Sequence, residues 1–387
     1  MVMNYMLSED EKAIIDIAHS VAIQKIKPLR KYYDEKEEFP YEIMKEFAKC
    51  DLCGTYIPKQ YGGLGSGIMG LVLLIEELCK VDGSIALSIA ATALGTLPII
   101  LFGNDKQKTK YLPDIASGKK LAAFGLTEAE AGSDVCNIKT VATKTGDFYI
   151  IDGIKCFITN GGDAQIYTVF AKTNFTKGAR GISCFIIEKG QQGFHFGKKE
   201  KKMGIKSSST RELIFNKCKV HKDQRLGKEG YGLLIAQTTL NNSRPGVAAQ
   251  ALGIATGAFE EAIKYARIRK QFGNSIISFQ AIQHMLADMA TEIEAARSLL
   301  YTCARTIDSK IQKRISKESA MVKLFCSEMA VRVTLNSMQI LGGNGYLRDY
   351  PIEKMFRDAR ITTLYEGTSQ IQKNEIAANL IREFSTK

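Results

Sequence analysis

The chain has 387 residues, of which 45% are hydrophobic and 24% charged, which is typical of a soluble globular protein with room for two or three domains. No apolar run predicts a membrane-spanning helix, because Ser, Thr, Gly and Pro interrupt the longest uncharged stretch, Gly83 to Asn104. The net charge of +12 is compatible with nucleic acid, a polyanionic cofactor or an acidic partner. The basic stretch Lys198 to Lys206 lacks interleaved aromatics, so we interpret it as a solvated face and predict no nucleic-acid binding.

The first predicted region is helical and runs from about residue 8 to 120. One apolar stripe has helical spacing along residues 14–22, and a second follows along residues 71–78. Breaks between helices are expected at the glycine-rich segment 61–65 and near Asn104.

The second region, from about 123 to 230, is predicted to form strands. Residues 148–159 predict a β-hairpin with its turn at Asp152-Gly153, because β-branched and aromatic residues flank that dipeptide. Further strands are expected at 166–171, 181–188 and 212–215. No helices alternate with these strands, so we expect a small antiparallel barrel or sandwich and not a parallel nucleotide-binding sheet.

From about residue 232 the apolar spacing is helical again, with long runs at 245–269, 279–307 and 318–340. Helices of this length predict a bundle. The expected fold class is therefore α+β, mainly α. It has an N-terminal α-helical domain at 1–122, a middle antiparallel β domain at 123–231 and a C-terminal four-helix-bundle domain at 232–387.

The segment 365–369, Tyr-Glu-Gly-Thr-Ser, has the strongest functional pattern. Ser369 and Gln372 have the spacing of a capping box, which predicts a helix that starts at Ser369 and places Glu366 just ahead of it in an apolar neighbourhood. Desolvation raises the pKa of such a carboxyl, which suits a general base near neutral pH. The alternative is an acid that only complements the helix dipole.

Four further segments have residues suited to a ligand. The segment 124–134, FGLTEAEAGSD, combines hydroxyls with a glycine, and the segment 157–162, FITNGG, places an aromatic ring near a hydroxyl. The segment 267–273, RIRKQFG, is followed by Phe279-Gln280 and offers arginines for a pyrophosphate, while 339–346, QILGGNGY, is a glycine-rich helix end. Each has a structural alternative: a turn, core packing, surface charge or a helix C-cap.

Several known motifs are absent. No G-x-G-x-x-G follows a strand, and there is no G-x-x-x-x-G-K-[ST] or G-x-S-x-G. These absences argue against a Rossmann dehydrogenase, a P-loop protein and an α/β-hydrolase.

The nine cysteines are scattered and odd in number, which favours free thiols over a disulfide framework. Cys50 and Cys53 form a lone C-x-x-C with no second pair at zinc-finger spacing, so no metal site is predicted. The N-terminal residues have neither a hydrophobic signal core nor an Arg-rich transit pattern. A cytoplasmic location is expected, or the mitochondrial matrix if a targeting peptide was removed.

The five segments, in this order and at these separations, resemble the acyl-CoA dehydrogenase family of flavoenzymes. The likeness covers about residues 7–381 and is strongest to short- and medium-chain members. It implies an FAD-dependent enzyme with FAD held between the domains. It also implies a homotetramer, a dimer of dimers, in which a neighbour's chain completes each FAD site.

Residue by residue, the resemblance assigns the catalytic base to Glu366, which would take the α-proton of the acyl thioester while the β-hydride goes to flavin N5. Its backbone N–H and a flavin ribityl hydroxyl would stabilise the enolate oxygen. The segment 339–343 is implied to reach the neighbouring subunit's FAD. Substrate contacts are implied for Ser133, Asn241, Arg244, Glu366 and Gly367. FAD contacts are implied for Phe124, Leu126, Thr127, Gly132, Ser133, Phe157, Thr159, Arg269, Gln271, Phe272, Phe279, Gln280, Gln339, Gly342, Gly343, Thr368 and Gln370.

A few residues depart from the usual family pattern. Phe157 stands where many members have Trp, Ala129 where Pro is usual, and Asn241 where Asp is frequent. Ser243 occupies the position where isovaleryl-type members carry an alternative Glu, which disfavours that subfamily. Because Glu366 is not Asp, the nitroalkane-oxidising relatives are also disfavoured.

The resemblance places the acyl pocket partly on the segment 83–102, which carries no charge. A dicarboxylyl substrate such as glutaryl-CoA would leave a buried carboxylate unpaired there, so it is disfavoured. The Ala and Gly content of the segment, including Gly95, indicates room for a short, medium, branched or alicyclic acyl group.

We expect a dehydrogenase that passes electrons to electron-transferring flavoprotein. An acyl-CoA oxidase that uses O₂ is one alternative, although the chain is short for such an enzyme. A non-catalytic paralogue that acts as an assembly or scaffold protein is another, and the intact Glu366 argues against it.

Overall fold

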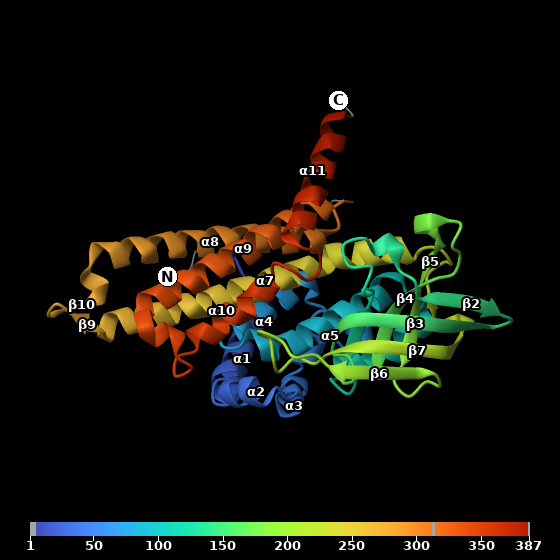
Figure 1. Cartoon of the computed structure of the whole chain (residues 1–387), viewed down its shortest axis with the longest axis horizontal. Helices are drawn as coiled ribbons and strands as arrows, with labels where there is room; N and C mark the ends of the chain where they lie inside the picture. The colour runs from blue at the N-terminus through green and yellow to red at the C-terminus, as the bar shows by residue number, and fades with distance from the viewer. Residues whose placement is uncertain (1–4, 312–313, 386–387) are drawn as a thin grey trace.

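The computed structural model describes residues 5–311 and 314–385. Helices from both ends of the chain pack together, and a β-sheet lies at one end of the molecule (Figure 1). The long C-terminal helices lie side by side, the N-terminal helices pack beneath them and beside the sheet, and the last helix points away from the body. The predicted arrangement of helical, β and helical regions is therefore confirmed.

The N-terminal region is helical, as predicted. Ser8 and Asn104 start two of its helices through capping boxes, so the break expected near Asn104 is correct. Ile14, Ala18 and Val21 form the buried face of the first helix. The helices are α1 (Glu9–Val21), α2 (Arg30–Lys36), α3 (Tyr41–Lys49), α4 (Gly67–Cys79), α5 (Gly83–Phe102) and α6 (Asp105–Ala116).

Helix α5 is long and apolar enough to cross a membrane by length and composition alone, contrary to the sequence-based expectation. However, 72% of its apolar window is buried inside the protein. It packs against β1 (Ala122–Gly125) and against α7 (Gly232–Ile268), so neighbouring protein surrounds it. We therefore interpret α5 as a core helix.

The middle region is one sheet of eight strands in the order β6-β7-β3-β2-β4-β5-β8, with β1 paired to β4. Most neighbouring strands are antiparallel, as predicted, but β4 pairs in parallel with β1 and, at one position, with β2. The remaining strands are β2 (Val141–Thr145), β3 (Phe148–Thr159), β4 (Ile166–Lys172), β5 (Ile182–Glu188), β6 (Phe194–Lys199), β7 (Thr210–His221) and β8 (Arg225–Leu226).

The hairpin predicted at 148–159 is wrong, because these residues form the single strand β3. The chain reverses earlier, at residues 146–147 between β2 and β3. Asp152-Gly153 instead marks an irregularity in the pairing of β3 with β7, where the Asp152 carboxylate accepts the Lys217 N–H at 2.7 Å. A Cβ on Gly153, whose φ is 144°, would come within 2.6 Å of Thr140 Oγ1. The glycine therefore permits a close approach and not a chain reversal.

The C-terminal region is a helical bundle with one small hairpin. Pro245, taken as the start of the first helical run, lies inside a longer helix. The helices are α7 (Gly232–Ile268), α8 (Gln280–Ser309), α9 (Ser316–Leu341), α10 (Ile352–Ile361) and α11 (Ser369–Ser385), and the hairpin strands are β9 (Lys270–Gln271) and β10 (Asn274–Ser275).

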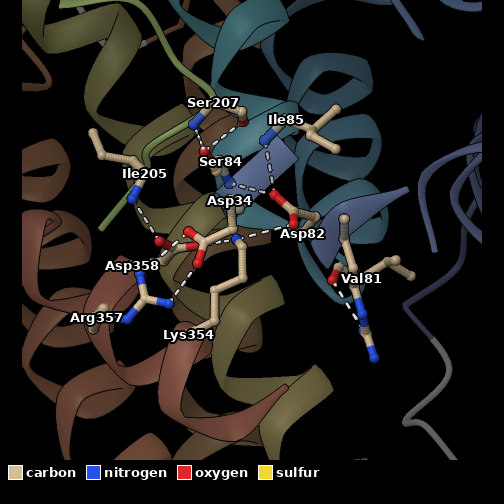
Figure 2. Close-up of polar contacts among 12 residues, drawn as sticks. Asp34, Val81, Asp82, Ser84, Ile85, Ile205, Ser207, Lys354, Arg357 and Asp358 are labelled. Carbon is tan, nitrogen blue, oxygen red and sulfur yellow. Dashed lines mark hydrogen bonds and ion pairs between the residues drawn. The ribbon is translucent and has the colours of Figure 1, made fainter. Parts of the chain in front are cut away.

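Buried charged groups join α10 to the rest of the molecule (Figure 2). Lys354 Nζ lies 2.5 Å from Asp358 Oδ2 and 2.9 Å from Asp82 Oδ2, and the Asp82 side chain also caps the N-terminus of α5. Asp358 accepts the Ile205 N–H at 2.5 Å, from the segment between β6 and β7. Burial lowers the pKa of Lys354, but the two carboxylates outweigh it and raise the pKa overall. The lysine therefore stays charged.

Two neighbouring contacts extend this cluster. Arg357 of α10 donates hydrogen bonds of 3.2 and 2.7 Å to the Asp34 carboxylate of α2, and the Ser84 and Ser207 hydroxyls lie 2.6 Å apart (Figure 2). The cluster thus fixes α10 relative to α2, to the start of α5 and to the segment before β7.

The nine cysteines are free thiols, and Cys136 is the exposed one among them. Within residues 5–311 and 314–385, no group of three or more His, Cys, Asp and Glu side chains could hold a metal ion.

Candidate active site

Glu366 lies in the loop between α10 and α11, and α11 begins at Ser369 as predicted. Glu366 has a φ of 51° and Gly367 a φ of 95°, so both have left-handed backbone. The φ of Gly367 favours glycine, and a Cβ there would also come within 2.6 Å of Gln372 Nε2 and displace that side chain. A glutamate in this conformation is unusual, and such strained positions cluster at functional sites.

The capping box predicted for α11 is wrong in its partners. Thr368 Oγ1, and not Ser369, accepts a backbone N–H of the first turn, at 3.3 Å. The buried Ser369 hydroxyl makes no hydrogen bond with the described residues. Gln372 instead donates to the carbonyls of Glu366 and Gly367, at 3.1 and 2.9 Å. The pattern found the helix start and missed the cap by one residue, because the loop folds back over the first turn.

The Glu366 carboxylate contacts α7. Ser243 Oγ donates to Glu366 Oε2 at 2.5 Å, and Arg244 Nε donates to the Glu366 carbonyl at 3.4 Å. Arg244 Nη1 also donates to Asn241 Oδ1 at 3.1 Å, which brings the predicted substrate contacts Asn241, Arg244, Glu366 and Gly367 together. Burial raises the pKa of Glu366, and the Ser243 hydrogen bond and two nearby cations oppose that rise only in part. A raised pKa suits a base that works near neutral pH.

Lys323 is the second of these cations, and the sequence analysis did not single it out. It is fully buried on α9, and its Nζ donates to the Gly367 carbonyl at 2.7 Å. Its helical spacing places it on one face with the buried Ser319 and Cys326. A charge on the buried face of a helix is the pattern that could have found it.

A hydrogen-bonded path joins the Glu366 loop to the helix predicted to line the acyl pocket. The Tyr365 hydroxyl donates to the Gln250 side chain, and Gln250 Nε2 donates to the Gly83 carbonyl at the start of α5, at 3.0 Å. The middle of α5 rests on β1, so the path reaches the β-sheet. The base loop, α5 and the sheet are therefore linked by direct contacts.

Gly95 does not provide room for a substrate, contrary to the expectation. A Cβ there would come within 2.5 Å of Ala123 N, so the glycine lets α5 lie directly on β1. By helical spacing, Leu87, Ala91 and Leu94 share one face of α5. Leu87 and Ala91 are buried and Leu94 is partly exposed, and none of the three belongs to the main core cluster, so they form an apolar face beside it.

On the sheet side, three predicted flavin contacts are available for binding. Thr127 and Ser133 lie in the loop after β1, and Thr159 ends β3. Among the hydrogen bonds of the described residues, none uses these three hydroxyls. A Cβ on Gly132 would meet no atom within 4 Å, so the space beside it is open.

Phe124 and Leu126, from the same segment, face the protein interior. The Phe124 ring lies 5.0 Å from the Phe170 ring, and Leu126 is 7% exposed. Leu126 therefore belongs to the core and Phe124 packs against it, while the Phe124 side chain stays partly exposed.

A bulge in β3 turns Phe157 outwards. The pairing with β7 shifts between Lys155 and Ile158, and Phe157 has a φ of 59° with 66% of its surface exposed. Lys155 points the other way and is buried, with Nζ 2.7 Å from Glu128 Oε1. Burial lowers the pKa of Lys155 to about 8, and Glu128 opposes this. This pair, which the sequence analysis missed, ties the loop that holds Thr127 to β3.

A second group of the predicted FAD contacts lies at the far end of the bundle. Arg269 is exposed at the end of α7 and forms no ion pair within the described chain, and Phe272 at the β9–β10 turn is 94% exposed. The end of α9 is close by, because Asn344 Nδ2 donates to Tyr265 Oη of α7 at 2.7 Å. This end holds the predicted residues Arg269, Gln271, Phe272, Phe279, Gln280, Gln339, Gly342 and Gly343.

Within one chain, the residues around Glu366 lie far from the predicted FAD contacts around Arg269. Arg244 and Arg269 are 25 residues apart along α7, or about 37 Å at 1.5 Å per residue. Figure 1 shows the β9–β10 hairpin at the end of the bundle opposite the sheet. Thr368 belongs to the Glu366 loop, and Gln370 is exposed on the first turn of α11.

A cavity of about 290 Å³ opens beside Asn241. It is basic, because Lys310 and Arg314 contribute to its wall. Its lining residues are Thr238, Asn241, Asn242, Ile307, Lys310, Arg314, Ile315 and Ser316.

Comparison with known proteins identifies the family. Three family models match in series: the acyl-CoA dehydrogenase N-terminal domain at residues 8–119, the middle domain at 123–218 and the C-terminal domain at 230–381. The chain belongs to the acyl-CoA dehydrogenase family.

Its relatives are similar over nearly the whole chain. An acyl-CoA dehydrogenase of Bacillus subtilis is 43% identical, with 97% of this chain and 99% of the relative covered. A short-chain-specific acyl-CoA dehydrogenase of Clostridium acetobutylicum is 43% identical, with 98% and 100% covered. A 3-(aryl)acrylate reductase of Clostridium sporogenes is also 43% identical, with 97% and 99% covered.

Solved structures agree. Butyryl-CoA dehydrogenase from Megasphaera elsdenii matches with a TM-score of 0.95 at 42% identity, covering 98% of this chain and 100% of that one. A chain from a study of the electron transferring flavoprotein of Acidaminococcus fermentans matches with a TM-score of 0.96 at 46% identity, with the same coverage. An acyl-CoA dehydrogenase complexed with FAD from Bacillus anthracis matches with a TM-score of 0.93 at 34% identity, covering 100% of this chain and 69% of that one.

This acyl-CoA dehydrogenase is therefore an FAD-dependent enzyme. The residues present fit a flavin. Phe157 exposes a ring on which an isoalloxazine can pack, and the space over Gly132 is open. The hydroxyls of Thr127, Ser133 and Thr159 make no hydrogen bond with the described residues, so they can bind the cofactor's polar edge.

Proposed function

We propose that the enzyme dehydrogenates a short-chain acyl-CoA to its 2-enoyl-CoA, with Glu366 as the base that removes the α-proton. The environment of Glu366 carries this proposal. Burial raises the pKa of the carboxyl, Ser243 donates to it at 2.5 Å, and the loop is held in a strained conformation beside α7. The short-chain-specific relative and the butyryl-CoA dehydrogenase structure support the choice of acyl length.

The same loop offers a donor for the charge that develops on the thioester. Removing the α-proton builds negative charge on the carbonyl oxygen. Among the backbone hydrogen bonds of residues 5–311 and 314–385, none uses the Glu366 N–H, so it is free to donate to that oxygen. FAD, when bound, supplies the acceptor for the β-hydride. Phe157 and Thr159 would position its ring system against the substrate.

The substrate would lie between α5 and the Glu366 loop. The apolar face formed by Leu87, Ala91 and Leu94 suits an uncharged acyl chain, straight, branched or alicyclic, and lacks a cation for a dicarboxylyl tail. The cavity beside Asn241, with Lys310 and Arg314, suits the phosphates of CoA. Arg244 would lie between the acyl chain on α5 and the CoA phosphates in this cavity.

The electron acceptor is proposed to be electron-transferring flavoprotein, supported by the likeness to the chain from the Acidaminococcus fermentans flavoprotein study. An oxidase that uses O₂ is the alternative. The reductase name of the Clostridium sporogenes relative favours a second candidate function, in which the same site reduces a 2-enoyl thioester.

We also propose that FAD is shared between subunits of a homotetramer. Arg269 lies about 37 Å from Arg244 along α7, and the end of α9 contacts α7 near Arg269, through Asn344 and Tyr265. In one chain they are too far from the Glu366 loop to complete the same site, whereas a neighbouring chain can present them to it.

Anaerobic bleaching of the bound flavin by a panel of acyl-CoA thioesters tests the proposal. We expect butyryl-CoA to bleach the flavin fastest, and glutaryl-CoA to bleach it little. No bleaching by any saturated acyl-CoA would overturn the proposed function, and preferred turnover of glutaryl-CoA would overturn the uncharged pocket. Hydrogen peroxide formed as fast as enoyl-CoA would identify an oxidase. Rapid reoxidation by electron-transferring flavoprotein, with slow reaction with O₂, would support the dehydrogenase.

A further inference from the structure

Among the lysines that the structure describes, Lys323 and Lys155 are both fully buried, but they differ in their partners. Lys155 has the Glu128 carboxylate 2.7 Å from its Nζ. Lys323 forms no ion pair with any described carboxylate, and its Nζ donates to the Gly367 carbonyl at 2.7 Å. Burying a cation without a paired anion is costly, so this position needs a compensating interaction.

The Gly367 carbonyl belongs to a loop that three helices hold by its backbone. Lys323 of α9 and Gln372 of α11 both donate to it, while Arg244 of α7 and Gln372 donate to the preceding carbonyl, that of Glu366. Glu366 and Gly367 both have positive φ. A strained backbone persists when its surroundings over-determine it, and these donors meet that condition.

We propose that Lys323 is a positioning residue for the base: its ammonium holds the Gly367 carbonyl, and its charge favours the ionised form of the Glu366 carboxylate. The inference rests on the proposed function and deepens it, because it explains how a buried glutamate stays ready to accept a proton.

The charges around Glu366 support this role. Arg244 from α7 and Lys323 from α9 are the cations that lower the pKa of Glu366 against burial, and Tyr365 lies beside it in the loop. The negative charge of Glu375, on α11, in turn opposes the lowering of the Arg244 pKa by burial. Burial lowers the pKa of Lys323 to about 8, and the charge of Glu366 opposes this. If the Lys323 charge is removed, one of the two cations that lower the pKa of Glu366 is lost. The effect of burial then raises the pKa of Glu366 further. At a fixed pH below that pKa, less of the enzyme would then carry an ionised base.

Three variants separate the two parts of the role. Lys323→Met removes the donor and the charge, Lys323→Gln keeps a donor without the charge, and Lys323→Arg keeps the charge. Arg297→Gln is the matched control, since Arg297 is another buried cation, on α8, that contacts Glu76 and not the Glu366 loop. Each holoenzyme is first checked for its circular dichroism spectrum and FAD content.

Stopped-flow flavin reduction by butyryl-CoA is then measured anaerobically against pH, with and without α-deuterium. For Lys323→Met and Lys323→Gln we expect the apparent pKa of reduction to rise by about one unit, which is a roughly tenfold slower reaction at low pH, with proton transfer still slowed by α-deuterium. Lys323→Arg should restore the wild-type profile, and Arg297→Gln should leave it unchanged.

Folded, FAD-loaded Lys323→Gln with a wild-type profile would overturn the inference. A slower rate with an unshifted profile would overturn it too, because a purely structural lysine predicts that result. Failure of the wild-type enzyme to be bleached by butyryl-CoA or any other saturated acyl-CoA would instead overturn the proposed function, so the two failures are distinguishable.

Discussion

At the scale of single residues, Glu366 combines an unusual backbone with an unusual environment. Its φ of 51° points the side chain toward Ser243, while Gln372 and Arg244 bind its carbonyl. Burial and neighbouring cations act on its pKa in opposite directions, and burial dominates. A carboxyl held in this way is pre-organised for proton transfer.

Replacing Glu366 with Gln should therefore remove the base and keep the structure. We expect flavin reduction by butyryl-CoA to slow by about 10²–10⁴-fold, with the fold and FAD content unchanged. Rapid-scan absorbance under anaerobic conditions measures the rate. Glu292→Gln, at a partly buried acid on α8 that pairs with Arg332, should react close to the wild-type rate. A near-wild-type rate in Glu366→Gln would exclude it as the base.

At the scale of elements, α5 is positioned by its contact with β1 and by the charged cluster at its N-terminus. Gly95 lets the helix lie on the strand, and Asp82 caps it while binding Lys354 of α10. The helix that offers the acyl surface and the helix that leads to Glu366 are thus held by the same cluster.

Gly95→Ala should force α5 away from β1, because the added Cβ would lie 2.5 Å from Ala123 N. We expect a loss of about 1–3 kcal/mol in the free energy of unfolding, measured by urea denaturation. Gly246→Ala is the control, since a Cβ at this helix-interior glycine meets no atom within 4 Å. It should be neutral or stabilising by up to about 1 kcal/mol. Equal effects of the two changes would contradict the packing argument.

Lys354→Met should leave the buried carboxylates of Asp82 and Asp358 without their shared cation. We expect a loss of about 3–5 kcal/mol in unfolding free energy. Lys12→Met, at the exposed Lys12–Glu9 pair, should leave the unfolding free energy close to that of wild type. A stability of Lys354→Met equal to that of wild type would show that the cluster does not stabilise the joint between α5 and α10.

At the scale of the whole molecule, the length of α7 separates the predicted FAD contacts into two groups. Thr127 and Ser133 lie in the loop after β1 and Thr159 ends β3, whereas Arg269 and the end of α9 lie near the β9–β10 hairpin. Figure 1 shows this hairpin at the end of the bundle opposite the sheet. A shared cofactor would make FAD binding and subunit assembly depend on each other.

Arg269→Ala should therefore weaken FAD retention and tetramer stability together, because a ligand bound only by the assembled state stabilises that state by mass action. Absorbance at the flavin band and analytical ultracentrifugation over a dilution series measure the two effects. Arg267→Ala, two residues earlier and also exposed, should leave both unchanged. A variant of Arg269 that stays fully yellow and tetrameric on dilution would rule out the shared site.

The sequence alone determined what depends on local periodicity and local chemistry. Helical spacing located both helical regions, and the break expected near Asn104 falls at the start of α6. The β-branched runs located β3, β4, β5 and part of β7, but not β1, β2, β6 or β8. Glu366 ahead of a helix start was also visible, because helix starts depend on residues three or four positions apart.

The tertiary structure decided whatever depends on a distant neighbour. The dipeptide Asp152-Gly153 is compatible with a chain reversal or with another segment packing closely against Gly153. The position of Thr140 next to Gly153 shows that close packing is the case here. Gly95 could have made space, but β1 fills it. Lys323 gains its proposed role from a carbonyl 44 residues away. The periodicity of apolar residues in the sequence cannot reveal such contacts. They arise from how the elements pack and not from the propensity of any one segment.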